Sequence, residues 1–75
     1  MATMKQAMQA KDKASRILKG LPGVNGIGVT WDAAGQPCVR VNVDFEIDDF
    51  DRRQIPSRID DVPVLVQPIG AIELE

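Results

Sequence analysis

The sequence predicts an α+β domain in which an N-terminal amphipathic helix packs on a three-stranded, mainly antiparallel sheet. Three observations lead to this fold: apolar residues with helical spacing before Gly20, alternating valines after Gly35, and a second valine-rich segment near residue 64. The expected order is helix, strand, strand, a loop or short helix, and strand, which is an α+β arrangement. At 75 residues, the chain is expected to form one small domain spanning residues 1–75.

The helix is expected to lie between residue 2 and residue 19, a stretch without proline or glycine. Gly20 suits its end, and Pro22 prevents its continuation. Residues 1–4 are expected to fray. The apolar stripe recurs at spacings of three, four or one, and comprises Ala7, Ala10, Ala14, Ile17, Leu18 and Leu21, with Met4 and Met8 as extensions.

A hairpin is expected to follow the helix. Residues 24–31 form its first strand, with Ile27, Val29 and Trp31 on one face. Asp32 and Gly35 suit the turn between the strands. In the second strand, "CVRVNVDF", inward-facing residues alternate with polar ones and Cys38, and the inward set is Val39, Val41, Val43 and Phe45. Trp31 is interpreted as a packing residue of the core or of the hairpin end.

Residues 46–61 are interpreted as a loop with at most a short helix from Pro56 to Ile59. Ile55, Ile59 and Phe50 are expected to anchor this loop to the core. The third strand has one apolar face, formed by Val62, Val64 and Val66, and it contains Pro63, which favours an edge strand or a strand start. We expect Pro68 and Gly70 to break it before a short extension, and Leu74-Glu75 is interpreted as a tag remnant.

The stretch "GVNGIGV" resembles a phosphate-binding loop only in its glycine content. Such loops follow a strand and precede a helix, whereas this one follows a helix and precedes a strand. The spacing is also G-x-x-G-x-G instead of G-x-G-x-x-G. We therefore interpret Gly26 and Gly28 as a bare strand face that permits close approach by another backbone.

No catalytic residue, metal ligand set or cofactor is predicted. The chain has one cysteine and no histidine, so Cys38 lacks the base that would activate it. The acidic run from Asp44 to Asp51 fails the calcium-loop pattern, because Asp49 and Ile55 occupy the positions that need glycine and glutamate. A small divalent-cation-binding protein stays open as an alternative.

Charge is unevenly distributed along the chain. Residues 1–21 carry five cations against Asp12, and residues 22–75 carry four arginines against ten acids. The basic helix lacks interleaved aromatics and the whole chain is acidic, so no nucleic-acid partner is expected. The helix cations are expected to attract the acidic loop of their own chain. No secretory signal or membrane segment is recognised, and the single cysteine favours the cytoplasm.

The segments "LPGVNGIGV", "GQPCVRVNV" and "IPSRIDDVPVLVQPIG" resemble a small bacterial module across residues 18–72. That module occurs as a short stand-alone protein and as a non-catalytic N-terminal part beside trypsin-like serine peptidase domains. Asp61 stands where the module's pattern has glycine. The resemblance implies a fold and brings no catalytic residue or ligand. The matching positions are Gly23, Gly26, Gly28, Gly35, Pro37, Pro56, Ile59, Asp60, Val62, Pro63, Val64 and Gly70.

The sequence favours a non-enzymatic protein-interaction or self-association module, with a protein partner or a second copy as its binding partner. A regulatory or folding-assistant role for a serine peptidase is the alternative that the resemblance implies. No small-molecule substrate is evident. The candidate interaction surface combines the bare strand face with the basic helix, and comprises Gly26, Gly28, Thr30, Lys13 and Arg16.

Overall fold

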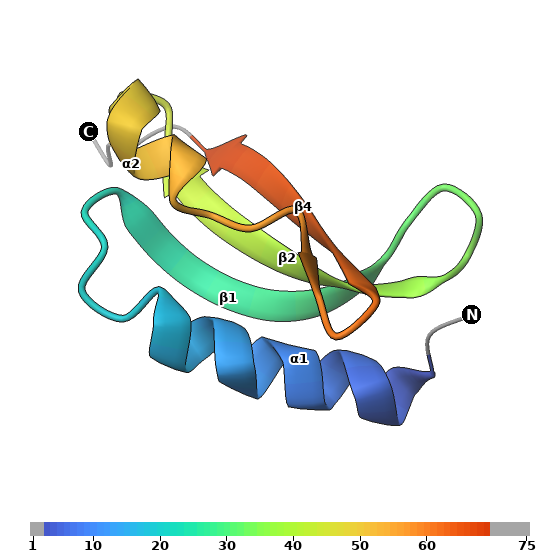
Figure 1. Cartoon of the computed structure of the whole chain (residues 1–75). Helices are drawn as coiled ribbons and strands as arrows, with labels where there is room; N and C mark the ends of the chain where they lie inside the picture. Colours follow the sequence, from blue (N-terminus) through green and yellow to red (C-terminus); the bar gives the residue numbers. More distant parts are fainter. Residues whose placement is uncertain (1–2, 70–75) are drawn as a thin grey trace, which may run out of the picture.

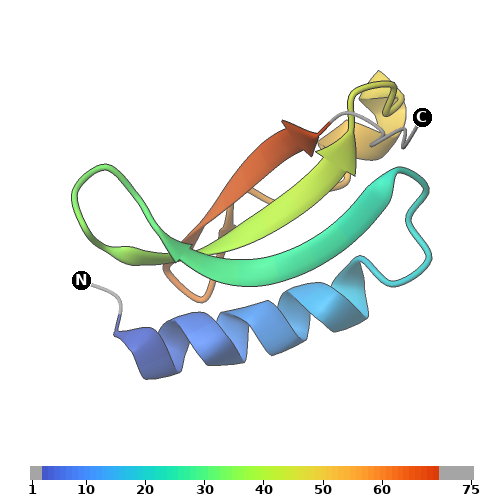
Figure 2. The same ribbon diagram turned by 180° about the vertical axis from the view of Figure 1, so that it is seen from behind.

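The computed structural model describes residues 3–69 and consists of an N-terminal helix on one face of a four-stranded mixed sheet (Figures 1 and 2). The predicted α+β class and the packing of the helix on the sheet are confirmed, but the three-stranded, mainly antiparallel sheet is wrong. In chain order, the elements are α1 (Met4–Ile17), β1 (Val24–Trp31), β2 (Pro37–Asp44), α2 (Asp49–Arg53), β3 (Arg58–Ile59) and β4 (Val62–Ile69).

The order of strands in the sheet is β1-β2-β4-β3. β1 and β2 form the predicted antiparallel hairpin, with Val29 opposite Val39. β4 pairs in parallel with the other side of β2, with Val64 opposite Val39, and β3 forms a short antiparallel ladder with β4. A parallel neighbour needs a crossover of a dozen or more residues. Residues 45–61 supply that crossover, which the sequence pattern alone did not distinguish from a loop between antiparallel strands.

The helix begins with a capping box. The Thr3 hydroxyl accepts the Gln6 N–H at 3.1 Å, and the Gln6 side chain accepts the Thr3 N–H at 2.8 Å. Of the four residues expected to fray, Thr3 and Met4 therefore belong to the cap and first turn, and residues 1 and 2 lie outside the described part. Gly20, at φ +82°, lies in the turn that follows the helix.

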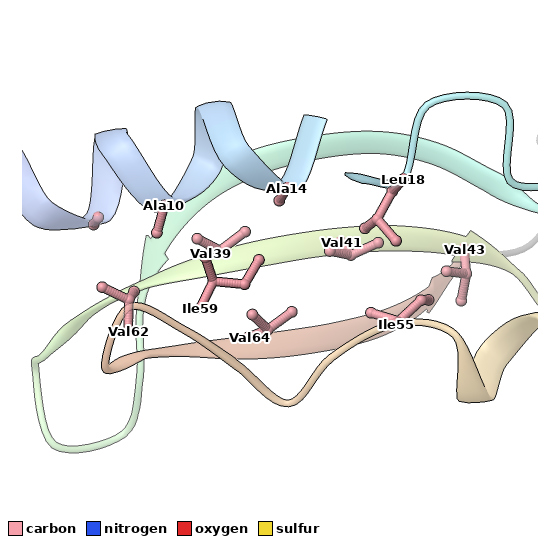
Figure 3. Close-up of a cluster of buried hydrophobic side chains, with 11 residues drawn as sticks. Ala10, Ala14, Leu18, Val39, Val41, Val43, Ile55, Ile59, Val62 and Val64 are labelled. Carbon is pink, nitrogen blue, oxygen red and sulfur yellow. The ribbon is translucent and has the colours of Figure 1, made fainter. Parts of the chain in front are cut away.

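The core lies between α1 and the valine row of β2 (Figure 3). Val39, Val41 and Val43 have no exposed surface, and they face a strip of small residues on the helix, Ala7, Ala10 and Ala14. Small side chains let the helix axis approach the sheet closely. Leu18, Ile55, Ile59, Val62 and Val64 complete the buried cluster.

Several residues expected inside lie on the surface. Phe45 and Phe50 are 70% and 68% exposed, and Met8, Ile17 and Trp31 are also exposed. β2 ends at Asp44, where the chain turns and the Ile47 N–H donates to the Asp44 carbonyl at 3.1 Å. Ile47 therefore packs against the core in the place that the alternating pattern assigned to Phe45.

The crossover also differs from its prediction. The short helix α2 begins after Asp48, whose carboxylate accepts the Phe50 N–H at 3.2 Å, and not at Pro56. Ile59 belongs to β3, and it is buried as expected. β4 continues through Pro68 to Ile69, so the predicted break at Pro68 is wrong. Gly70 and the predicted extension after it lie outside the described residues.

Replacing Ala10 by leucine is expected to destabilise the fold by about 1–3 kcal/mol, because the added side chain overpacks the contact between α1 and β2. Urea unfolding followed by far-UV circular dichroism measures the change. Gln9→Leu places the same side chain at an exposed neighbouring position and is the control. Equal stabilities for the two variants would show that the helix does not approach β2 this closely.

The turn between β3 and β4 holds Asp60 and Asp61 at φ +50° and +65°. Two consecutive left-handed residues are typical of a type I′ hairpin turn, which favours glycine or asparagine. Asp61→Gly is therefore expected to raise the free energy of unfolding by up to about 1 kcal/mol, and Asp61→Ala to lower it. Thermal unfolding of the two variants tests these opposite directions, and a loss of stability in the glycine variant contradicts them.

Candidate interaction surface

β1 forms one edge of the sheet, and from Ile27 to Trp31 its outward backbone groups have no hydrogen-bond partner within residues 3–69. In an antiparallel ladder, alternate residues direct their N–H and C=O groups away from the neighbouring strand. The Asp32 N–H donates to the Gln36 carbonyl at 2.9 Å, and this bond fixes the alternation. Ile27, Val29 and Trp31 therefore direct their backbone groups outward.

The two edges of the sheet differ in how they are protected. Natural edge strands are usually short, or they carry charges or prolines that prevent pairing with another chain. On the far side, β3 has only two residues and β4 contains Pro63 and Pro68. β1 spans eight residues, "VNGIGVTW", without a charge or a proline. Its one irregularity is a bulge at Asn25, near its start.

A groove of about 640 Å³ runs between the C-terminal half of α1 and the first half of β1. Lys11, Ser15 and Lys19 line its helix side. Its apolar floor and strand side come from Leu18, Leu21, Val24 and Ile27. The turn from Gly20 to Gly23 closes one end. The groove therefore lies on the helix-covered face of the sheet, beside the unpaired edge.

Exposed apolar side chains gather at the opposite end of this edge. The chain reverses between α1 and β1, so the start of α1 and the end of β1 lie together (Figures 1 and 2). Met4 and Met8 are on the same flank of the helix as Lys11 and Ser15, because their spacings are three, four and seven residues. Met4 is 38% exposed, Met8 56% and Trp31 59%. The β1 edge is thus bordered by an apolar patch at one end and a groove at the other.

The five residues predicted as an interaction surface lie on different sides of the molecule. Gly26, Gly28 and Thr30 face away from α1, because Ile27 and Val29 between them pack against the core. Lys13 is on the other flank of α1, where its Nζ lies 2.6 Å from the Asp60 carboxylate. Arg16 is exposed on the helix. The structure therefore does not bring the glycines and the two cations together.

The glycine face is also less bare than the sequence suggests. A Cβ on Gly28 would lie 3.5 Å from Nη2 of Arg40, and a Cβ on Gly26 would lie 3.7 Å from Nδ2 of Asn42. The side chains of β2 thus extend over the glycines of β1. The Arg40 Nε within this layer is buried and has no hydrogen-bond partner in the described part of the chain.

The acidic loop remains apart from the helix cations. Within residues 3–69, the one ion pair is Lys13–Asp60, which is half-exposed and so contributes little to stability. The expected attraction between the basic helix and the loop at residues 44–51 therefore forms no ion pair there. Asp44, Glu46, Asp48 and Asp51 border a hollow of about 270 Å³. In the described part of the chain, no three acidic or cysteine side chains are grouped closely enough to hold a metal ion.

Cys38 lies on the face opposite α1, yet its side chain has no exposed surface. Burial raises the pKa of the thiol above its ordinary value, and the nearby negative charge of Asp32 raises it further. Both effects favour the neutral thiol, whereas nucleophilic cysteines need the thiolate. The site therefore does not activate Cys38 for covalent chemistry.

Comparison of the chain with models of protein families, with curated proteins and with solved structures gives no match. The resemblance to the module beside serine peptidases thus stays a prediction. Of the helices in the described residues, none has the length and apolar character needed to cross a membrane.

Sequence reasoning missed the groove and the apolar patch. It placed Met4 and Met8 in the core stripe and interpreted Trp31 as a packing residue. The helical spacing of the sequence does indicate their position, because Met4 and Met8 lie to one side of the buried stripe of Ala7, Ala10 and Ala14 around the helix axis. That offset places the two methionines on the flank of the helix.

Gly28→Ala and Gly23→Ala are expected to act in opposite directions. A Cβ at Gly28 makes an ordinary contact, so alanine should stabilise the strand by about 0.4–1 kcal/mol. Gly23 has φ +87°, and its Cβ would lie 2.8 Å from Cγ1 of Ile47, so alanine there should destabilise the fold. Chemical unfolding measures the free energy of unfolding of both variants. A lower value for Gly28→Ala than for the wild type would mean that this face tolerates no side chain.

Proposed function

We propose that the chain is a non-enzymatic protein-interaction module whose binding surface is the outer edge of β1 together with the adjoining flank of α1. The observation that carries this proposal is the contrast between the two sheet edges. One consists of the two-residue β3 and the remainder of β4, which contains Pro63 and Pro68, and the other presents eight residues without charge or proline.

The chemistry of this surface suits recognition of an extended strand. In strand addition, main-chain hydrogen bonds provide affinity and pockets for alternate side chains provide specificity. The outward groups of Ile27, Val29 and Trp31 offer those hydrogen bonds, and the neighbouring groove offers a pocket. A second copy and a different protein both satisfy this description. A serine peptidase is one candidate partner on the resemblance alone.

The absence of an assembled reaction centre in the described residues also supports a binding role. The chain has no histidine, and the Cys38 thiol is buried and held neutral. The hollow among the acidic side chains is open and lacks a nucleophile with a base beside it. The groove is lined by lysines and apolar groups, which suit a peptide better than a reacting small molecule.

Val29→Pro is expected to weaken binding at the edge about tenfold, because it removes one outward N–H and leaves its acceptor on the partner unsatisfied. Val29→Ala is the matched control, since it shortens the same side chain and keeps the N–H. Each variant, carrying an affinity tag, is mixed with untagged chain and with lysate of the cell that encodes it. The retained protein, either the untagged copy or another species, is then quantified.

Circular dichroism of both variants must first show the same folded signal. The proposal expects a protein that the wild type and Val29→Ala retain and Val29→Pro loses. If every retained protein binds the three chains equally, the β1 edge is not the binding surface and the proposed function is wrong.

A further inference from the structure

We propose that the partner at this edge is a second copy of the chain, and that the two β1 strands pair antiparallel with each Trp31 indole in the groove of the other copy. This inference rests on the proposed function and names its partner. It is carried by the placement of three features along one edge: a protruding indole at one end, a groove at the other, and unpaired backbone groups between them.

A two-fold axis reverses one copy of β1 relative to the other. Outward-directed residues must then face each other, and the registers that bring each indole to the other copy's groove place Ile27 opposite either Val29 or Trp31 of the second copy. In both registers, Trp31 of one copy lies near residues 25–27 of the other. Those residues form the strand side of the groove. The Trp31 indole of each copy therefore meets the groove of the other copy, so the same contact forms twice in the symmetric dimer.

The faces of the sheet agree with this pairing. Directly opposed residues of antiparallel strands place their side chains on the same face. Trp31 and Ile27 are an even number of residues apart in β1, so their side chains lie on the same face of the sheet. Ile27 packs on the helix-covered face. The indole would therefore lie on the side where α1 and β1 border the open groove. The α1 helices of the two copies would then run antiparallel on that face, with Met4 and Met8 directed toward the contact.

Charge does not contribute to this pairing, because Asp32 lies near Cys38 on the face opposite α1, whereas Lys11 and Lys19 border the groove on the helix-covered face. A parallel arrangement of the two strands would bring groove to groove and indole to indole.

The contact is small, so the dimer is expected to be weak. One strand pair and two indoles bury less than the roughly 1,200–2,000 Å² of a stable interface. Association should therefore develop between micromolar and near-millimolar concentration.

The single tryptophan makes the test direct, because the chain has no other tryptophan and no tyrosine. Sedimentation equilibrium and tryptophan emission are measured over the same concentration series. The expected result is a doubling of mass with a shift of the emission to shorter wavelength at the same midpoint. Trp31→Ala should weaken the dimer about tenfold or more, as expected for a central aromatic anchor.

Phe50→Ala is the matched control, since Phe50 is also an exposed aromatic but lies on α2 and not on the β1 edge. It should leave the dissociation constant unchanged. A dimer whose emission does not shift, or that Trp31→Ala leaves intact, overturns the inference. A chain that stays monomeric throughout also overturns it. If the chain is monomeric but the wild type retains a different protein from the lysate that Val29→Pro does not retain, the proposed function still stands. If Val29→Pro retains every protein that the wild type retains, the dimer and the proposed function are both wrong.

Discussion

The burial of one valine row dictates most of this structure. Val39, Val41 and Val43 have no exposed surface, so β2 must be covered by a helix and paired on both sides. One neighbour comes from the hairpin, and the other comes from the later valine-rich segment, Val62–Ile69. Once β2 is central, β1 is necessarily an edge strand. The unpaired edge is therefore a consequence of how a short chain completes its core.

The sequence predicted the parts of this fold that depend on local pattern. The alanine strip of α1, the strands β1 and β2, and the turn at Asp32 and Gly35 all have short-range signals, and the structure contains each of them. The pairing of β4 has no such signal, because alternation at Val62, Val64 and Val66 is identical for a parallel and an antiparallel neighbour. Only the length of the crossover distinguishes the two. Both Asp48 and Pro56 are suited to the start of a helix. The short helix begins after Asp48, which caps it, and Arg52 and Arg53 lie in its last turn, where cations are favourable.

The candidate site was predictable only in outline. The glycines of β1 correctly pointed to a strand that another chain could approach, but they led to the face of the sheet and not to its edge. On that face, Arg40 and Asn42 cover Gly28 and Gly26. The groove could not be derived from sequence, since it depends on how far α1 extends over β1. Exposure of Trp31 likewise depends on tertiary packing at the end of β1.

The two edges of the sheet differ in their protection, and this difference supports the proposed binding role of β1. A charged residue at any of several positions in β1 would block pairing at little cost, because these side chains are only partly buried. The chain applies such protection on its other side, where Pro63 and Pro68 lie in β4. The same chain leaves β1 without it and places exposed Met8 and Trp31 along that edge. The groove and its lysines adjoin the same edge. Their placement on one side of the molecule supports the proposed binding at that edge.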